Sequence, residues 1–298
     1  MSLQRLYGLL VFIIPPLLWT GNVIIARVVR DDIAPLTLSS ARWLISLVLL
    51  LPFALPHFRS QFPLYRRHKA LLFGTSLTGI AAFNTLVYTG LHHTGSTNAL
   101  LLNSCIPVLI MLLGALFYRE PLNRRQGAGL LLSLAGVAAI VLQGSWQRLA
   151  ALQVNQGDLW ILAAVLCWAF YTIWMRRIPP EINRTALTAL QISIGLFLLT
   201  PFTLWEWTTM PSAPLVFNQN ALLALVYIGI FPSVAAYLCY NAAIARFGAV
   251  RAGLSIHLMP VFGSILAVTL LGETFHLYHL AGISAIFTGI FLCSKKTL

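Results

Sequence analysis

The chain has 298 residues, of which 59% are hydrophobic and only 9% charged, and its mean hydropathy is +0.84. A soluble domain carries about a quarter charged residues, so this composition argues against a water-soluble enzyme. The formal net charge of +12 does not indicate nucleic-acid binding, because the basic residues lie between long apolar stretches, where they act as membrane-topology signals.

Ten apolar stretches follow one another with short joints, and each is long enough to cross a hydrocarbon core of about 30 Å as a helix. They predict an all-α integral membrane protein with ten transmembrane helices and no soluble domain. The first stretch is kept as a span, because the residues after Pro15-Pro16 make a poor signal-peptide cleavage site. The predicted spans are 7–26, 35–57, 69–91, 95–118, 126–143, 158–176, 185–206, 220–243, 248–271 and 277–294.

Basic residues are distributed unevenly between the two ends of these spans. One end carries fifteen Lys and Arg residues, whereas the other carries three, Arg27, Arg30 and Arg148. Because cytoplasmic loops are enriched in Lys and Arg, both termini are predicted to lie in the cytoplasm, with the protein in a bacterial inner membrane. The four cysteines lie inside apolar stretches without CxxC spacing, so we expect no disulfide framework, no metal site and no cofactor.

The second half of the chain repeats the first. A shift of 149 residues lays Trp19 on Trp168. A shift of 153 residues aligns Gly95 with Gly248, Pro107-Val108 with Pro260-Val261, Glu120 with Glu273, Gly129 with Gly282 and Gly136 with Gly289. The predicted repeats, residues 1–147 and 148–298, have five spans each. Because five is odd, the second repeat must enter the membrane from the opposite side, and such inverted repeats are typical of alternating-access transporters.

A family resemblance rests on this repeated pattern. Gly95, Ala99, Pro107-Val108, Glu120, Gly129 and Gly136, which recur in the second half, resemble the drug/metabolite transporter superfamily, and the ten spans are similar to its EamA-type exporters. The stretch Trp19-Thr20-Gly21-Asn22 and the aromatic spans look like the bacterial aromatic amino-acid exporters. The resemblance covers the whole chain and implies a metabolite exporter. Its fourth and ninth spans, which contain Pro107 and Pro260, would act as gates.

Two pairs of repeated residues have expected roles. Pro107 and Pro260 lie in mid-span, where a proline removes a backbone hydrogen bond and kinks the helix. They are either static kinks or the hinges of gating helices, and their recurrence in both halves favours hinges. Glu120 and Glu273 each precede a short helix, where a carboxylate satisfies unpaired N–H groups, so both are predicted to be structural caps.

Few ionisable groups are expected inside the membrane. Arg42 is the one cation within a predicted span, about 10 Å from the outer end at 1.5 Å per residue. Such a charge is a functional candidate, but a long side chain also reaches the interface, and the repeat counterpart Gln191 is neutral, so a structural role is favoured. All seven acidic residues are expected in loops or at span ends. His257 is either a proton site or, as we favour, a neutral hydrogen-bonding histidine.

A central cavity is predicted from aromatic and amide side chains, because exposing buried amides to lipid is costly. Some of these amides could instead only join helices, and the tryptophans could form an interfacial belt, although Trp19 and Trp168 lie deep in their spans. The candidates are Trp19, Asn22, Asn84, Tyr88, Asn98, Asn103, Trp168, Tyr171, Tyr237, Tyr240, Asn241, Ser255 and His257.

The predicted function is export of small neutral or zwitterionic metabolites, above all aromatic or bulky apolar amino acids, by a functional monomer in the lipid bilayer. Nucleotide-sugars, sugar phosphates or drug-like amphiphiles are the alternative substrates, although phosphate favours Arg or Lys clamps and only Arg42 is within reach. An integral-membrane enzyme is disfavoured, because no cluster of His and acidic residues or nucleophile–base pair is apparent.

Overall fold

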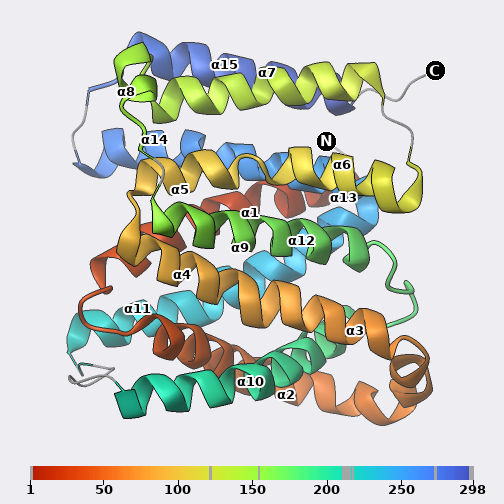
Figure 1. Ribbon diagram of the computed structural model, residues 1–298. Helices are drawn as coiled ribbons and strands as arrows, with labels where there is room; N and C mark the ends of the chain where they lie inside the picture. The colour runs from red at the N-terminus through yellow and green to blue at the C-terminus, as the bar shows by residue number, and fades with distance from the viewer. Residues whose placement is uncertain are drawn as a thin grey trace.

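The computed structural model describes residues 3–120, 123–153, 155–209, 216, 218–271 and 274–294. Every regular element within these ranges is helical. The long helices lie roughly parallel to one another in stacked layers (Figure 1). The predicted all-helical fold is therefore confirmed for the described part of the chain.

Each half of the chain contributes a similar series of helices. The first half contains α1 (Leu3–Val28), α2 (Pro35–Arg67), the continuous segment α3 (Lys69–Thr75), η1 (Ser76–Ala82) and α4 (Phe83–His93), then α5 (Ser96–Asn103), α6 (Ile106–Tyr118) and α7 (Arg124–Val141). A short helix that the sequence did not predict, α8 (Trp146–Ala150), follows. The second half contains α9 (Gln156–Met175), α10 (Arg184–Thr209), the continuous segment α11 (Gln219–Ile230), η2 (Phe231–Ala235) and α12 (Ala236–Phe247), then α13 (Ala249–Leu254), η3 (Ser255–His257), α14 (Leu258–Leu271) and α15 (Leu277–Ser294).

The helices fall on the predicted apolar stretches, with one large difference in length. The second stretch was predicted to end at residue 57, whereas α2 continues to Arg67 as a helix with a polar, basic end. Eight helical segments in the described ranges are long and apolar enough to cross a membrane. α7 and α15 are not among these eight, because α7 begins with Arg124-Arg125 and the apolar part of α15 is short. The count of ten spans therefore stays a prediction.

Two π-helical turns, η1 and η2, interrupt long helices near their middle, and side chains satisfy the carbonyls that these turns release. Pro232 has no N–H to donate to the carbonyl of Ile228, and the Ser233 hydroxyl donates to that carbonyl instead, at 2.5 Å. The indole N–H of Trp19 donates to the Pro232 carbonyl at 3.1 Å. In η1, Tyr237 likewise donates to the Gly79 carbonyl at 2.7 Å. The irregular turns thus hold aromatic side chains at the centre of the bundle.

The two spans that contain the equivalent prolines Pro107 and Pro260 are broken rather than smoothly kinked. The fourth span ends as α5 and restarts as α6, with Pro107 in the first turn of the new helix, where a missing N–H costs nothing. The ninth passes through the 3-10 turn η3 before α14, which contains Pro260. The break between α5 and α6 leaves the Ser104 carbonyl without a helical donor, and the Nε2 atom of His257 lies 2.8 Å from this carbonyl oxygen.

Close helix contacts form the two opposite edges of the bundle (Figure 1): α7 packs on α15, and α2 packs on α10. Glycines make the first contact possible. A Cβ atom added at Gly136 would lie 2.6 Å from the carbonyl oxygen of Gly282, and one added at Gly129 would lie 2.6 Å from that of Gly289. Such small residues let membrane helices approach until their backbones touch.

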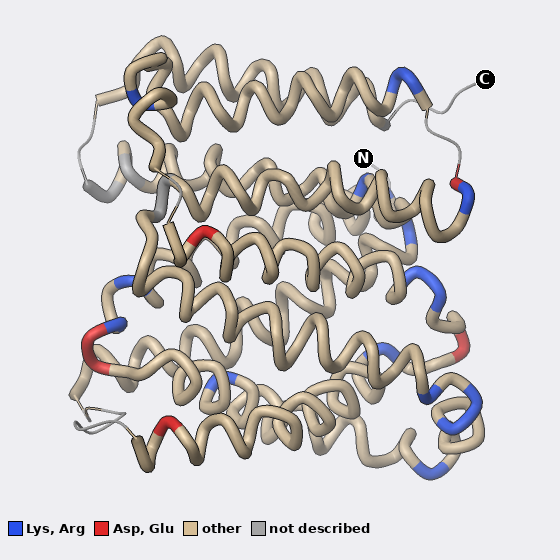
Figure 2. The backbone as a smooth tube through the Cα atoms, in the orientation of Figure 1, with Lys and Arg blue, Asp and Glu red and all other residues tan. Residues whose placement is uncertain are grey.

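The two ends of the described chain lie at the same end of the bundle. Arg246 donates to the carbonyl of Gln4 at 2.9 Å, and Arg251 donates to that of Cys293 at 3.1 Å. Both arginines flank the joint between α12 and α13, so the start of α1 and the finish of α15 are neighbours. Most Lys and Arg positions gather at this end (Figure 2).

The α7–α15 contact generates a stability prediction. Gly136→Ala should lower the midpoint of thermal unfolding in detergent, because the added methyl group meets the Gly282 backbone, and overpacking of this kind costs about 1–3 kcal/mol. Gly127→Ala is the matched control on the same helix, because a Cβ atom there meets nothing within 4 Å. Equal midpoints for the two variants would contradict the close packing.

Candidate functional site

Aromatic rings from α1, α9 and α12 form a single buried cluster at the centre of the bundle. The ring of Trp19 lies 5.2 Å from that of Trp168 and 5.2 Å from that of Tyr240, and Trp168 lies 5.4 Å from Tyr237. The Trp168 side chain is 1% exposed. These two tryptophans therefore lie in the interior and not in an interfacial belt, which agrees with their predicted depth.

Predicted amides and phenols form hydrogen bonds with one another around this cluster. The bonds run from Tyr88 to Asn22 (3.1 Å), from Asn84 to Tyr237 (3.1 Å) and from Tyr171 to Asn241 (2.8 Å). Each bond joins different helices, and all six side chains are buried. These three bonds fix the orientation of the amide groups of Asn22, Asn84 and Asn241.

A small cavity lies within the cluster. Its volume is about 40 Å³, which is room for about one water molecule. The Asn103 side-chain oxygen is buried and has no hydrogen-bond partner among the described residues. The predicted site residues that line the cavity are Trp19, Asn22, Asn84, Asn103, Trp168 and Tyr237.

The other seven predicted site residues lie outside the cavity lining. Asn98 lies near the start of α5, where it donates to both carboxylate oxygens of Asp158, at 3.0 and 3.2 Å. Ser255 is buried, but its hydroxyl donates to the Ala252 carbonyl at 2.7 Å. His257 lies beside the cavity. Tyr88, Tyr171, Tyr240 and Asn241 support the lining residues from behind.

Both ring nitrogens of His257 are hydrogen-bonded, and the imidazole is fully buried. A carbonyl oxygen can only accept, so Nε2 carries a hydrogen and donates to Ser104 at 2.8 Å. In a neutral ring the other nitrogen, Nδ1, accepts from the Ser133 hydroxyl, 2.6 Å away. A neutral histidine satisfies this geometry completely, which favours the structural interpretation of this residue.

Arg42 is the site residue that the sequence interpretation undervalued. The expectation that its side chain reaches the outer interface is wrong, because it is 1% exposed and turned inward. Its Nε donates to Ser233 at 2.8 Å, and its Nη1 donates to Asn84 at 2.7 Å and to Tyr88 at 2.5 Å. The guanidinium carbon also lies 4.8 Å from the centre of the Trp43 ring. The signal that pointed to it was an ionisable residue within a predicted span.

No described carboxylate pairs with Arg42. The two ion pairs of the described residues, Arg30–Asp31 and Arg176–Glu120, are solvent-accessible. Acidic side chains that are buried lie at helix ends: Glu206 accepts from the backbone N–H groups of Leu36 and Thr37, at 2.9 and 2.8 Å, at the start of α2. Asp158 belongs to the capping box of α9. The expected peripheral location of the acids therefore holds for these two residues.

The predicted capping role of Glu120 is wrong. Asn123 caps α7 by accepting from the backbone N–H of Arg125 at 2.9 Å. Glu120 instead accepts from Arg176 at 2.5 Å and so joins the two halves of the chain. Asn123 directly precedes the first residue of α7 and caps it, whereas the Glu120 carboxylate pairs with the Arg176 guanidinium. Glu273 lies outside the described residues.

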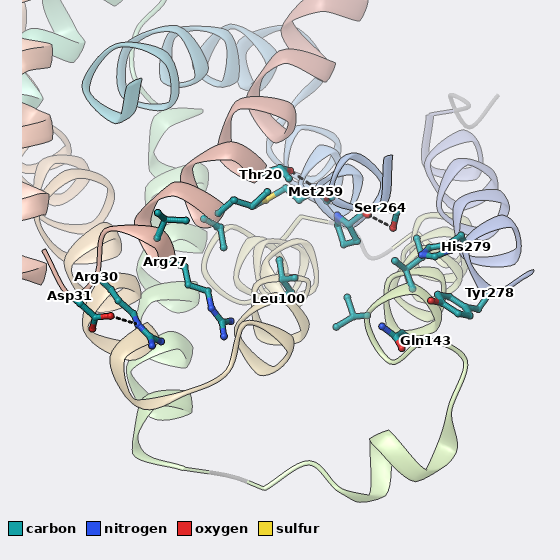
Figure 3. A pocket seen from close by; sticks show the side chains of 17 residues that line it. Thr20, Arg27, Arg30, Asp31, Leu100, Gln143, Met259, Ser264, Tyr278 and His279 are labelled. Carbon is teal, nitrogen blue, oxygen red and sulfur yellow. Dashed lines mark hydrogen bonds and ion pairs between the residues drawn. The ribbon is translucent and has the colours of Figure 1, made fainter. Parts of the chain in front are cut away.

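A larger pocket of about 610 Å³ opens beside the cavity, and Arg27, Leu100, Gln143 and His279 lie around it (Figure 3). We call it the outer pocket; α1, α14 and the start of α15 line much of it. Val23 and Met259 line both the outer pocket and the cavity. The Thr20 hydroxyl lies 3.2 Å from the Met259 carbonyl, so α1 and α14 are in contact at this point. These residues separate the cavity from the outer pocket.

Comparisons with known proteins agree with this architecture. A model of the EamA-like transporter family matches residues 6–142 and again residues 155–295. The uncharacterized transporter YetK of Bacillus subtilis is 28% identical over 278 residues, which cover 93% of this chain and 83% of the relative. A solved crystal structure with 21% sequence identity has a TM-score of 0.74 and is matched over 96% of each chain.

Two similar proteins have names that mention amino acids. A probable terminal-alkyne amino-acid exporter of Streptantibioticus cattleyicolor is 25% identical over 222 residues, 74% of this chain and 71% of the relative. A probable amino-acid metabolite efflux pump of Salmonella typhimurium is 28% identical over 190 residues, 61% of this chain and 62% of the relative. With the family model matching nearly the whole chain, the protein belongs to the EamA-like transporter family and is a multi-pass membrane transporter.

Proposed function

We propose that the protein exports small neutral or zwitterionic metabolites by alternating access, and that its substrates are amino acids with aromatic or bulky apolar side chains. The observation that carries this proposal is the cavity, which combines the rings of Trp19 and Trp168 with the amides of Asn22, Asn84 and Asn103. Rings offer stacking surfaces, and amides both donate and accept hydrogen bonds. The names of the two amino-acid exporting relatives support it, and the proposal includes no enzymatic activity.

An inverted repeat of residues 1–147 and 148–298, with five spans each, is part of this proposal. Residues that the repeat makes equivalent touch one another at the centre: Trp19 contacts Trp168, and the hydrogen-bonded pairs Asn84–Tyr237 and Ser104–His257 are each separated by 153 residues. Contacts between equivalent residues arise where a two-fold axis passes through an assembly. A pseudo-two-fold axis through the cavity accounts for all three.

Helix packing supports the same axis. The equivalent helices α2 and α10 run in opposite directions where they pack, as do α7 and α15 (Figure 1). The glycine contacts are reciprocal, since Gly129 meets Gly289 while Gly136 meets Gly282, and each contact exchanges equivalent residues. The family model also matches once in each half. Ten membrane crossings follow from this proposal, with α7 and α15 as the two that composition alone does not identify.

Orientation and assembly complete the proposal. The end of the bundle that gathers the basic residues (Figure 2) is assigned to the cytoplasm of a bacterial cell, with the protein in the inner membrane and both termini inside. The outer pocket then faces the exterior. Because the chain carries both halves of the repeat, a monomer suffices for transport.

Transport by purified protein in liposomes tests the proposed function. We expect labelled phenylalanine, tryptophan or leucine to equilibrate across the membrane at least about ten times faster than in protein-free liposomes, a tenfold change corresponding to about 1.4 kcal/mol in the barrier. Trp168→Ala should slow this flux, because it removes a ring that lines the cavity. Phe197→Ala, which alters a ring that is 78% exposed, is the control. Flux of sugar phosphates without flux of any amino acid would contradict the proposed substrate class.

The proline positions generate a second prediction. Pro107→Ala and Pro260→Ala should slow transport while the protein still folds, because a continuous helix across the break favours one of two states of similar energy. Single-turnover flux and the thermal unfolding midpoint measure the two effects separately. Pro63→Ala, at the polar end of α2 and remote from both breaks, is the control. Unchanged flux in both variants would leave the two prolines as static features.

A third prediction concerns coupling. We expect no uphill accumulation of substrate under an imposed pH gradient, because both contacts of His257 fit a neutral ring and the described buried carboxylates cap helix ends. Accumulation ratios in liposomes, with and without the gradient, provide the measurement. Uphill accumulation that disappears in His257→Gln would identify His257 as the coupling site. Accumulation that survives the substitution would place coupling at another group.

A further inference from the structure

We propose that Arg42 binds the carboxylate group of the transported substrate, an inference that rests on the proposed function. The guanidinium group lies in the interior of the bundle with three neutral hydrogen-bond partners and no described carboxylate in contact. An arginine carries five N–H donors in a planar fork that matches a carboxylate. Among the described residues, no atom accepts a hydrogen bond from Nη2, so one edge of this fork is available.

The repeat indicates that the fold itself does not require this cation. The residue equivalent to Arg42 in the second half is Gln191, which is also fully buried and whose amide nitrogen donates to Thr75 at 2.7 Å. A neutral side chain therefore fills the same position in the other half. Because a buried charge is costly unless it is compensated, the positive charge in the first half points to an anionic group as its partner.

Arg42 reaches the cavity through side chains that line it. Asn84 accepts from Arg42 and lines the cavity, and Tyr88 accepts from Arg42 while donating to Asn22, which also lines it. A carboxylate that enters the cavity can take over as acceptor from these neutral groups and gain a charge-assisted, two-point contact. Asn103 lines the same cavity, and its side-chain oxygen has no described hydrogen-bond partner. This oxygen can accept a hydrogen bond from the ammonium group of an amino acid.

Charge on the outer route provides an independent observation. Only three basic residues lie at the outer end of the predicted spans, and two of them, Arg27 and Arg30, line the outer pocket (Figure 3). The same two arginines also line a narrow space of about 20 Å³ that reaches Tyr88. Asp31 also lines the outer pocket and pairs with Arg30, so the charged residues of this lining carry one net positive charge. Such an excess of positive charge favours the passage of a group with negative charge.

Competition binding to the purified full-length protein tests the proposal. The probe is labelled phenylalanine, and the competitors are 3-phenylpropionate, which keeps the carboxylate, and phenethylamine and phenylalaninamide, which lack it. We expect the two compounds without a carboxylate to compete about 10- to 100-fold more weakly than phenylalanine, the range that hydrogen bonds to a charged group support. 3-Phenylpropionate should retain measurable competition.

Variants separate substrate recognition from a structural role of Arg42. Arg42→Gln, which copies the residue of the other half, should weaken phenylalanine binding about 10- to 100-fold relative to phenethylamine binding, so that the preference for a carboxylate disappears. Arg42→Lys keeps the charge and should retain part of that preference. Arg176→Gln, which removes a cation from a solvent-accessible ion pair, is the control and should keep the full preference. Thermal unfolding midpoints identify any variant that fails to fold. If Arg42→Gln does not fold, competition by the analogue series in Arg42→Lys decides whether the carboxylate preference depends on Arg42.

The possible outcomes distinguish this proposal from the proposed function. Equal competition by phenylalanine and phenethylamine in the wild type, or a carboxylate preference that survives in folded Arg42→Gln, would overturn the role of Arg42 while leaving amino-acid export intact. Failure of every amino acid to bind, with Arg42-dependent binding of 3-phenylpropionate, would reject the proposed substrate and keep the carboxylate site. Absence of binding by any carboxylate would reject both.

Discussion

A buried guanidinium group that pairs with none of the described carboxylates is the constraint on which the centre of this protein depends. Arg42 needs hydrogen-bond acceptors, and the surrounding helices provide them through irregular turns as well as through ordinary side chains. Ser233 lies in η2, where Pro232 prevents the regular bond to Ile228. The Ser233 hydroxyl donates to that carbonyl and accepts from Arg42. A single proline therefore both interrupts the regular helix and positions the serine that accepts a hydrogen bond from the guanidinium group.

The proposed pseudo-symmetry and the departures from it have different consequences. Equivalent residues that touch, such as Trp19 and Trp168, give the two halves similar packing, which is what two states of similar energy require. Departures from symmetry supply the chemistry at the centre. The residue equivalent to Arg42 in the second half is the neutral Gln191. The residue equivalent to His257 in the first half is Ser104, whose carbonyl oxygen accepts a hydrogen bond from His257. In the proposed mechanism, the symmetric frame allows the movement and the asymmetric residues recognise the substrate.

Much of the fold could be predicted from the sequence, because membrane helices must satisfy their own backbone and so appear as apolar stretches. The same reasoning could not locate the π-helical turns, since nothing in a run such as 76–82 marks the extra residue. Caps were harder to assign. The carboxylate that caps α2 is Glu206, from a helix about 170 residues away, and only tertiary structure brings it to Thr37.

The residues of the candidate site could also be predicted only in part from the sequence. Residues such as Trp19, Asn84 and Trp168 could be predicted because polar and aromatic side chains deep in a span have to turn inward. Arg42 could not be oriented from the sequence, because its depth allows the side chain either to reach the interface or to enter the bundle. The contact of Asn98 with Asp158 could not be predicted either, because it joins the start of α5 to the start of α9, about 60 residues away in the chain.

The most direct measurement is an experimental structure of the protein with a transported amino acid bound. The account predicts density for the ligand in the enlarged central cavity, with its carboxylate within hydrogen-bond distance of the Arg42 guanidinium and its side chain against the rings of Trp19 and Trp168. Ligand density confined to the outer pocket, beside Arg27 and Arg30, with Arg42 still bonded only to Ser233, Asn84 and Tyr88, would contradict it.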